Sequence, residues 1–450
     1  MLFSIWLLEK RRYSKSNAGN LGMMKMNISQ KILKISEILK PILKKVFPQK
    51  LLQRVKRFFI ERNYNHMVEK GRVPFDRHKF PDGINLIGLV RAEMGLGQSC
   101  RLLANELTAG HISYSLYDFQ LGSKLLKSDD HSMDDRISEE FPYNINLIHI
   151  NPDEMMLMYT RMAEECWNRR YNIAFWLWEL EEIPEHWEKF FPMLDEIWTP
   201  SEFISNNLRK VTDLPVYTMP YCVEAPVDET LSREYFGLPE DKFLFLVMYD
   251  SNSTIERKNP TGAIRAFRKA FKNNSNVGIV VKINNAKPRD MEHLNRMLRG
   301  CANAYFIVET LSKVEVNSLI KQVDVFVSLH RAEGFGLVMA EAMIVGTPVI
   351  ATNWSSNTEF MNSNVACMVD CDFVSLKKDS PPYKKGSVWA EPDVDMAARY
   401  MRKLYRQPAY YEHLKKKAQE YILQKLSMEN AVSRLEKRVG EIYETFERNI

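Results

Sequence analysis

One stretch constrains the fold of this chain more than any other: SLHRAEGFGLVMAEAMIVGTPVIAT, at residues 328–352. Its pattern predicts a strand, a glycine loop, a helix and a second strand, with Glu333 in the loop and Glu341 in the helix. Glycines just before a helix let a ligand approach the backbone, and the first helical N–H groups favour an anion. The stretch therefore offers an anion-binding site and two carboxylates that can accept hydrogen bonds from sugar hydroxyls. This combination fits a sugar nucleotide.

Strand-length apolar runs alternate with helical stretches along most of the 450 residues, which predicts parallel sheets with helices on both faces. The runs form two groups, at 84–90, 144–150, 172–180 and 196–200, and at 243–250, 277–283, 304–310, 323–329 and 347–352. We therefore predict an α/β protein with two doubly wound, Rossmann-like domains, at 81–223 and 224–407, and C-terminal helices at 408–450. Ligands of open parallel sheets bind beyond the carboxyl ends of strands, so the glycine loops at 94–97 and 334–336 are expected to face each other across a cleft.

The positive charge is concentrated at the start of the chain. Residues 1–80 hold 19 Lys and Arg against 5 Asp and Glu, a net charge of +14; the whole chain carries +5, so the remainder carries −9. Apolar residues recur at helical spacing from 28 to 62 and are interrupted by Pro41 and Pro48, which predicts a basic, amphipathic helical extension. Such an extension suits an anionic membrane surface. A solvated or self-packing arm is the alternative, and we expect no nucleic acid among the partners.

The cysteines and the apolar runs bear on the compartment. The six cysteines show no paired metal spacing and no dense framework, which favours free thiols in a reducing environment. No apolar run reaches the roughly 18 residues of a membrane span. In the opening segment, charge follows the short apolar run, the wrong order for a cleaved secretory signal, and an upstream start at residues 1–22 is an alternative. We expect a cytoplasmic protein, or one peripheral to the inner face of the membrane.

The segment from His330 to Thr352, H-R-x-E-G-F-G-L-x-x-x-E-A-M-x-x-G-x-P-V-I-A-T, resembles the retaining GT-B glycosyltransferases of the group often called family four. The likeness covers roughly residues 84–405 and is strongest at 243–352. It implies that Glu333 contacts hydroxyls of the donor sugar and that Glu341 binds the ribose of the nucleotide. It also implies that one loop segment touches the sugar and the diphosphate through its backbone: Gly334, Phe335, Gly336 and Leu337.

A basic pair, Arg257 and Lys258, follows the strand-like run 243–250. Cations at a strand end can neutralise a diphosphate and stabilise the departing charge, and the resembled group usually places a basic pair here. The usual earlier arginine is absent, because the chain has Asp250 and Ser251 there. Arg331, just before the first glutamate, is a candidate to hold phosphate or to fix Glu333.

On the amino-terminal side, Gly95 and Gly97 resemble the glycine loop of the same group and would allow the diphosphate to approach; a simple tight turn is the alternative. His149 and Asn151 follow the run 144–150, where they would face the acceptor. His149 could orient a hydroxyl or act as a base, with a hydrogen-bonded structural histidine as the alternative.

The resemblance implies a retaining glycosyltransferase that moves a hexose from a nucleoside-diphosphate sugar to a glycan or lipid-linked acceptor, as in polysaccharide biosynthesis. We expect no cofactor and no metal, because the basic pair and a helix N-terminus can stabilise the leaving phosphate. Two Asp-x-Asp segments, at 370–372 and 393–395, are interpreted as solvated loops. The alternative function is a non-catalytic nucleotide-sugar-binding protein of the same fold.

Overall fold

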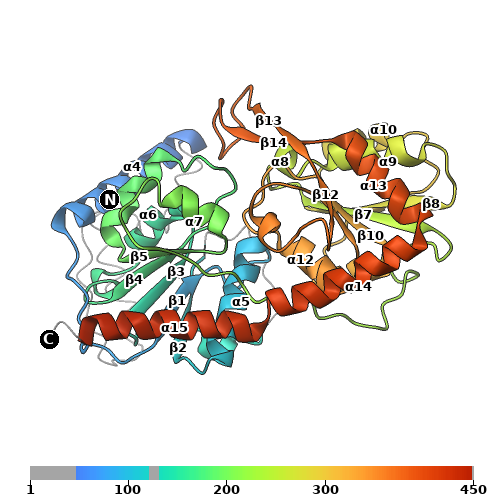
Figure 1. Ribbon diagram of the computed structural model, residues 1–450. Helices are drawn as coiled ribbons and strands as arrows, with labels where there is room; N and C mark the ends of the chain where they lie inside the picture. Colours follow the sequence, from blue (N-terminus) through green and yellow to red (C-terminus); the bar gives the residue numbers. More distant parts are fainter. Residues whose placement is uncertain (1–46, 121–130, 448–450) are drawn as a thin grey trace, which may run out of the picture. The chain divides into compact units, whose positions relative to one another are not determined.

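The structure is a computed structural model that describes residues 47–120 and 131–447 (Figure 1). The chain divides into a small unit, Met1–Glu69 with Met156–Glu164, and a large unit, Lys70–Met155 with Glu165–Ile450. The amphipathic pattern predicted from residue 28 lies outside the described residues up to 46. The domain boundaries at 80, 223 and 407 stay predictions.

The small unit contains most of helix α4 (Gln49–Lys70) and part of α6 (Pro152–Arg161). The rings of Tyr64 and Tyr159 lie 5.6 Å apart, and the Asn63 amide donates to Thr160 Oγ1 over 3.4 Å. Three α4 side chains are buried, Asn63, Tyr64 and Met67, whereas much of the helix is exposed. Apolar contact with α6 therefore holds only one end of this helix.

The first sheet of the large unit has six parallel strands in the order β2-β1-β3-β4-β5-β6. Its strands are β1 (Ile84–Gly88), β2 (Tyr114–Asp118), β3 (Ile145–His149), β4 (Tyr171–Phe175), β5 (Glu196–Thr199) and β6 (Val216–Thr218). Its helices are α5 (Gly95–Ala109) and α7 (Glu202–Leu208), with 3-10 turns at Asp134–Arg136, Glu164–Cys166 and Glu185–Met193. The central strands are buried along their whole length, as expected for a parallel sheet covered on both faces.

The second sheet repeats this design, in the order β12-β11-β10-β7-β8-β9. Its strands are β7 (Phe243–Asp250), β8 (Val277–Asn284), β9 (Ala304–Ile307), β10 (Val325–Ser328), β11 (Val349–Thr352) and β12 (Cys367–Val369). The helices are α8 (Ile255–Lys258), α9 (Pro260–Phe271), α10 (Pro288–Met297), α11 (Lys313–Gln322), α12 (Leu337–Ile344) and α13 (Val394–Arg406), with a 3-10 turn at Ser356–Glu359. The predicted α/β fold with two doubly wound sheets is confirmed.

Each sheet reverses its strand order once, and these reversals position the candidate site. In the first sheet β1 lies between β2 and β3, and in the second β7 lies between β8 and β10. Loops leave such a pair of strands in opposite directions, so a crevice opens at their carboxyl ends. The connection after β1 leads into α5, whose first turn holds Gly95 and Gly97, and Asn151 follows β3. The connection after β7 contains α8 with the basic pair, and the loop after β10 carries Glu333.

Two further elements complete the large unit. Helices α14 (Pro408–Lys425) and α15 (Met428–Glu447) run consecutively, α14 against α12 and α15 against α5 (Figure 1). A separate two-stranded sheet pairs β13 (Cys371–Ser375) with β14 (Val388–Pro392), antiparallel. The interpretation of 370–372 as a loop is therefore wrong at Asp372, which lies within β13 opposite Glu391. The strand forms because it pairs with β14, and this pairing cannot be recognised from the short segment itself.

Candidate functional site

The corner after β7 is formed by Asn259, which ends α8 and begins α9. Its backbone is left-handed, with φ of 49°, a conformation that asparagine tolerates better than most residues. The side-chain Oδ1 accepts from the backbone N–H of Gly262 over 3.0 Å, and Nδ2 donates to the carbonyl of Leu329 over 2.8 Å. Asn259 thus ties the basic corner to the end of β10. The sequence analysis did not select this residue, although an Asn-Pro pair at a helix start is a recognisable signal.

Glu333 lies against the predicted basic pair. Its Oε2 forms an ion pair with Lys258 Nζ and lies 3.6 Å from Arg257 Nη1. The carboxylate side chain is 14% exposed, and the backbone N–H of Glu333 donates to Ser355 Oγ over 3.1 Å. Burial disfavours the charged form, but Lys258, Arg257 and His330 outweigh it and lower the pKa of Glu333 to about 2. Glu333 therefore stays ionised and accepts hydrogen bonds.

Arg257 connects this cluster to the first sheet. The guanidinium donates from Nη1 to the carbonyl of Ala332 over 2.9 Å, and its Nη2 lies 3.7 Å from Glu179 Oε1, beyond the end of β4. Tyr383, in the β13–β14 connection, donates its hydroxyl to Glu179 Oε2 over 3.0 Å. Burial opposes the charge on Arg257, but Glu179, Tyr383 and Glu333 together raise its pKa. Tyr383 was not selected from the sequence, because it meets Glu179 and the basic pair only through tertiary folding.

The glycine loop after β10 is shaped for close backbone approach. A Cβ on Gly334 would lie 3.7 Å from Glu179 Cγ. Gly334 therefore lies beside Glu179, the carboxylate that also approaches Arg257. Gly336 precedes α12 at φ +103°, and a Cβ there would lie 2.6 Å from the end of Met339. The end of Met339 can move, so it is the positive φ that favours glycine here. Leu337 begins α12.

Phe335, between these glycines, does not point to a ligand. Its ring packs 5.2 Å from Tyr221 and 5.3 Å from Phe360, and the residue is buried. The backbone of the loop is the part available for recognition, as the resemblance implied. The structure places the side chain in the hydrophobic core instead.

Glu341 is almost completely buried, at 1% exposed, in the second turn of α12. Lys313, the first residue of α11, lies in ion-pair contact with Oε1. Oε2, however, has no hydrogen-bond partner within the described part of the chain. A buried carboxylate oxygen without a donor is costly, so its presence points to a ligand that supplies one. Lys313 was missed because nothing in its own segment marks it.

Arg331 is engaged elsewhere than expected. Its Nε and Nη2 donate to the two carboxylate oxygens of Glu391, over 2.6 and 2.9 Å, and Nη1 donates to the carbonyl of Glu256. A bidentate pair of this kind holds a guanidinium in one orientation. In this structure Arg331 therefore joins β14 to α8 and does not contact Glu333 through its side chain.

The two amino-terminal glycines differ in their surroundings. Both lie in the first turn of α5 and not in the predicted loop; a Cβ on Gly97 would lie 2.0 Å from the carbonyl oxygen of Ala92, so packing of α5 against the preceding loop requires this glycine. A Cβ on Gly95 would meet nothing within 4 Å, and this residue is exposed. Of the pair, only Gly95 leaves open space at the start of the helix.

His149 lies in the interior, at 0% exposed, stacked 5.1 Å from Phe175. Its Nε2 is 3.2 Å from Ser99 Oγ and 3.1 Å from the hydroxyl of Tyr221. Burial lowers the pKa of His149 to about 4. The ring is thus neutral and shielded from an acceptor, which favours the structural alternative over the role of base. Asn151 accepts from the backbone N–H of Leu177 over 3.0 Å.

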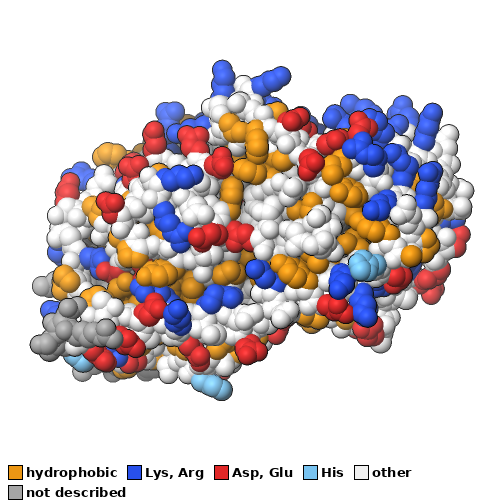
Figure 2. Space-filling model, in the orientation of Figure 1, with side chains coloured by type: hydrophobic (Ala, Val, Ile, Leu, Met, Phe, Trp, Pro, Cys, Tyr) orange, Lys and Arg blue, Asp and Glu red, His pale blue; other side chains and the backbone are white. Residues whose placement is uncertain are grey.

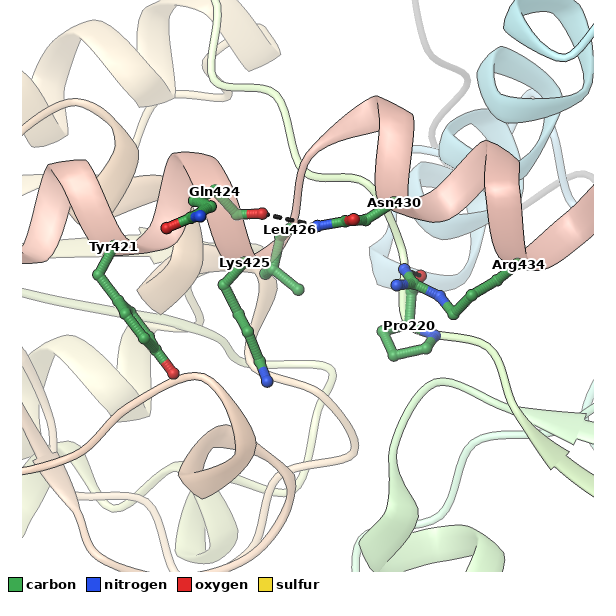
Figure 3. Close-up of a pocket in the computed structure, with 7 residues that line it drawn as sticks. All are labelled: Pro220, Tyr421, Gln424, Lys425, Leu426, Asn430 and Arg434. Carbon is green, nitrogen blue, oxygen red and sulfur yellow. Dashed lines mark hydrogen bonds between the residues drawn. The ribbon is translucent and has the colours of Figure 1, made fainter.

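A cavity of about 370 Å³ lies where α14 gives way to α15 (Figure 3). Its lining residues are Pro220, Tyr421, Gln424, Lys425, Leu426, Asn430 and Arg434. None of the predicted site residues belongs to it. Among the residues that the structure describes, no three His, Cys, Asp or Glu side chains converge as they would around a metal ion.

Residues 228–421 match the glycosyl transferases group 1 family. Among solved structures, HepE of Anabaena, in complex with UDP and glucose, is similar over 80% of this chain and 100% of its own, with a TM-score of 0.59 and 10% identity. A glycosyltransferase of Rickettsia africae is similar over 82% of this chain and 98% of its own, with a TM-score of 0.59 and 12% identity. Sucrose-phosphate synthase of Thermosynechococcus elongatus is similar over 82% of this chain and 100% of its own, with a TM-score of 0.58 and 14% identity. At these identities the likeness establishes the fold, and no curated protein sequence matches the chain.

Proposed function

We propose that this protein moves a hexose from a nucleoside-diphosphate sugar to an acceptor. The proposal starts from the match of residues 228–421 to the glycosyl transferases group 1 family and from the GT-B fold of the chain. The proposal includes retention of anomeric configuration, independence of metal, and a glycan or lipid-linked acceptor in polysaccharide synthesis. Three neighbouring structures of HepE contain UDP, UDP with glucose, or UDP-glucose, which supports a nucleotide-sugar donor here.

The buried carboxylate of Glu341 carries the proposal. It is 1% exposed; Oε1 is paired with Lys313, whereas Oε2 has no hydrogen-bond partner among the described residues. The vicinal hydroxyls of a ribose can supply two donors to one carboxylate. A hydrogen bond to a charged acceptor contributes roughly 1.5–3 kcal/mol, so filling this site would stabilise the bound nucleotide substantially.

Glu333, Lys258 and Arg257 would act on the sugar and the diphosphate. Because the pKa of Glu333 is about 2, this carboxylate cannot donate a proton near neutral pH, and its role is to accept hydrogen bonds from sugar hydroxyls. Lys258 and Arg257 now neutralise Glu333 and would also face the diphosphate, whose charge grows as the bond to the sugar breaks. In the resembled group, the leaving phosphate takes the acceptor proton on the same face of the sugar.

The proposed acceptor and location rest on charge. The concentration of +14 in residues 1–80 suits an anionic membrane surface, where a lipid-linked acceptor would lie. Within the ranges 47–120 and 131–447, no helix combines the length and apolar character needed to cross a bilayer. We therefore propose peripheral contact at the cytoplasmic face.

The test is a thermal-shift screen of the full chain against UDP-, GDP- and ADP-sugars, followed by turnover of the donor that binds. A ligand specific to the folded state raises the unfolding temperature in proportion to its affinity and concentration. Glu341→Gln should weaken binding of that donor about 10-fold or more while the protein stays folded. Glu436→Gln, at an exposed position on α15, is the matched control and should bind normally. Absence of a shift with every nucleotide sugar, or undiminished binding by Glu341→Gln, would refute the proposal.

The burial of His149 favours a second candidate, a nucleotide-sugar-binding protein without transfer, because it removes one polar group from the acceptor side. Glu333→Ala separates the two. In a transferase this change should reduce turnover far more than it reduces the bound fraction of donor at saturating concentration. A wild-type chain that binds donor but releases no nucleotide in the presence of membrane and glycan fractions would establish the second function.

A further inference from the structure

The β13–β14 hairpin is an insertion between β12 and α13 that pairs only with itself (Figure 1). It belongs to neither six-stranded sheet, and its connection spans residues 376–387. Its exposed surface therefore calls for a separate explanation.

The tip of the hairpin, residues 376–387, is basic. Its lysines are exposed and form no ion pair within the described residues: Lys377, Lys378, Lys384 and Lys385. The acidic residue in this segment is Asp379, whose carboxylate accepts from the backbone N–H of Lys385 over 2.8 Å. Figure 2 shows Lys and Arg side chains projecting where Figure 1 places the hairpin tip. The tip thus carries a net charge of +3, four Lys against one Asp.

Apolar side chains accompany this charge. Phe373 and Val388 lie on the same face of the hairpin and are 55% and 45% exposed, with the Phe373 ring packed edge-on to Trp354 at 4.5 Å. A soluble anionic polymer would be bound by the lysines alone. Exposed aliphatic and aromatic groups beside lysines are instead the composition of segments that lie in the boundary between lipid headgroups and acyl chains.

Both the base of the hairpin, through Glu391, and its tip, through Pro381 and Tyr383, are fixed to the candidate site. Glu391 on β14 holds Arg331 through two hydrogen bonds, and Tyr383 donates to Glu179 over 3.0 Å. Thr254, just before α8, donates its hydroxyl to the carbonyl of Pro381 over 3.3 Å. A surface bound by the tip would therefore be held in a defined position next to the basic pair.

We propose that the hairpin tip, residues 376–387 with Phe373 and Val388, binds the surface of an anionic lipid bilayer. The lysines contact the headgroups and the apolar side chains enter the interface. Delivery of a lipid-linked acceptor to the neighbouring site rests on the proposed function, whereas the lipid contact itself does not.

The test is hydrogen–deuterium exchange on the full chain with phosphatidylcholine vesicles that contain or lack phosphatidylserine. This local readout separates the hairpin from any binding by residues 1–80. Amides of 376–387 are expected to be protected by the anionic vesicles, and not by neutral ones, and high salt should remove the protection because it screens the lysines. The variant K377Q/K378Q/K384Q/K385Q should lose the protection and partition about 10-fold or more less, at roughly fivefold per lysine.

The matched control removes the same charge from four other exposed lysines: Lys210, Lys416, Lys417 and Lys437. It should keep the protection of 376–387. The hairpin variant should also keep the thermal shift with the donor nucleotide sugar, so failure here and failure of the proposed function are distinguishable. Unprotected hairpin amides in the wild-type chain would overturn the proposal. Protection by soluble dextran sulfate but not by anionic vesicles would overturn it too, in favour of a soluble polyanion.

Discussion

Replacing Glu333 with glutamine tests the charge balance of the site in the absence of any ligand. The change removes one negative charge and nearly preserves the shape of the side chain. Arg257, at 9% exposed, and Lys258, at 28%, would then have lost their shared partner. The expected result is a clear loss of stability at neutral pH.

The magnitude follows from the pKa of Glu333, which lies at about 2 instead of the ordinary 4.5. A depression of this size corresponds to about 3 kcal/mol of favourable interaction with the ionised form. Removing one partner of a buried ion pair costs about 3–5 kcal/mol, and the partial exposure of Lys258 reduces that figure. We therefore expect Glu333→Gln to lower the free energy of unfolding by about 2–4 kcal/mol at pH 7.

Denaturant unfolding as a function of pH provides the assay. Because the folded-state pKa is depressed, the contribution of Glu333 is present above about 4.5 and is lost as the pH falls toward 2. The difference between wild type and Glu333→Gln should therefore be largest at neutral pH and shrink in acid, whereas Glu436→Gln should stay within about 0.5 kcal/mol of wild type. Equal stability at pH 7, or a difference that does not change with pH, would refute the ion-pair account.

Three further predictions concern packing, burial and the hairpin. Gly97→Ala should destabilise the fold by about 3 kcal/mol, because its Cβ would lie 2.0 Å from the Ala92 carbonyl, whereas Gly95→Ala should leave the unfolding midpoint unchanged. Burial raises the pKa of Glu106 to about 8, so its contribution to stability is present below about pH 4.5 and is lost as the pH rises toward 8. The free energy of unfolding of the wild type should therefore fall by roughly 4 kcal/mol between pH 5 and pH 8, and Glu106→Gln should remove this fall. Tyr383→Phe should cost about 1–2 kcal/mol in denaturant unfolding, and an unchanged midpoint would contradict its buried hydrogen bond.

The strands predicted from the sequence are those with long apolar runs. The runs at 84–90 and 243–250 correspond to β1 and β7, which have a neighbouring strand on each side, because burial on both faces demands nearly continuous apolar residues. Of the strands in the two six-stranded sheets, three were not predicted: β2, β6 and β12. β6 and β12 have three residues each, and all three lie at sheet edges, where tertiary pairing decides the conformation and local pattern is weak.

Within the candidate site, the sequence alone located the strand-end loops and the acidic and basic residues that they carry. Helical and strand periodicity are local properties, so the positions of Glu333, Glu341 and the basic pair followed from short stretches of chain. Side-chain partners are not local. Tyr383 reaches Glu179 across 204 residues, and Arg331 reaches Glu391 across 60. Burial of His149 and the hydrogen-bond vacancy at Glu341 likewise depend on which distant side chains fill the surrounding volume, and only the folded chain determines that.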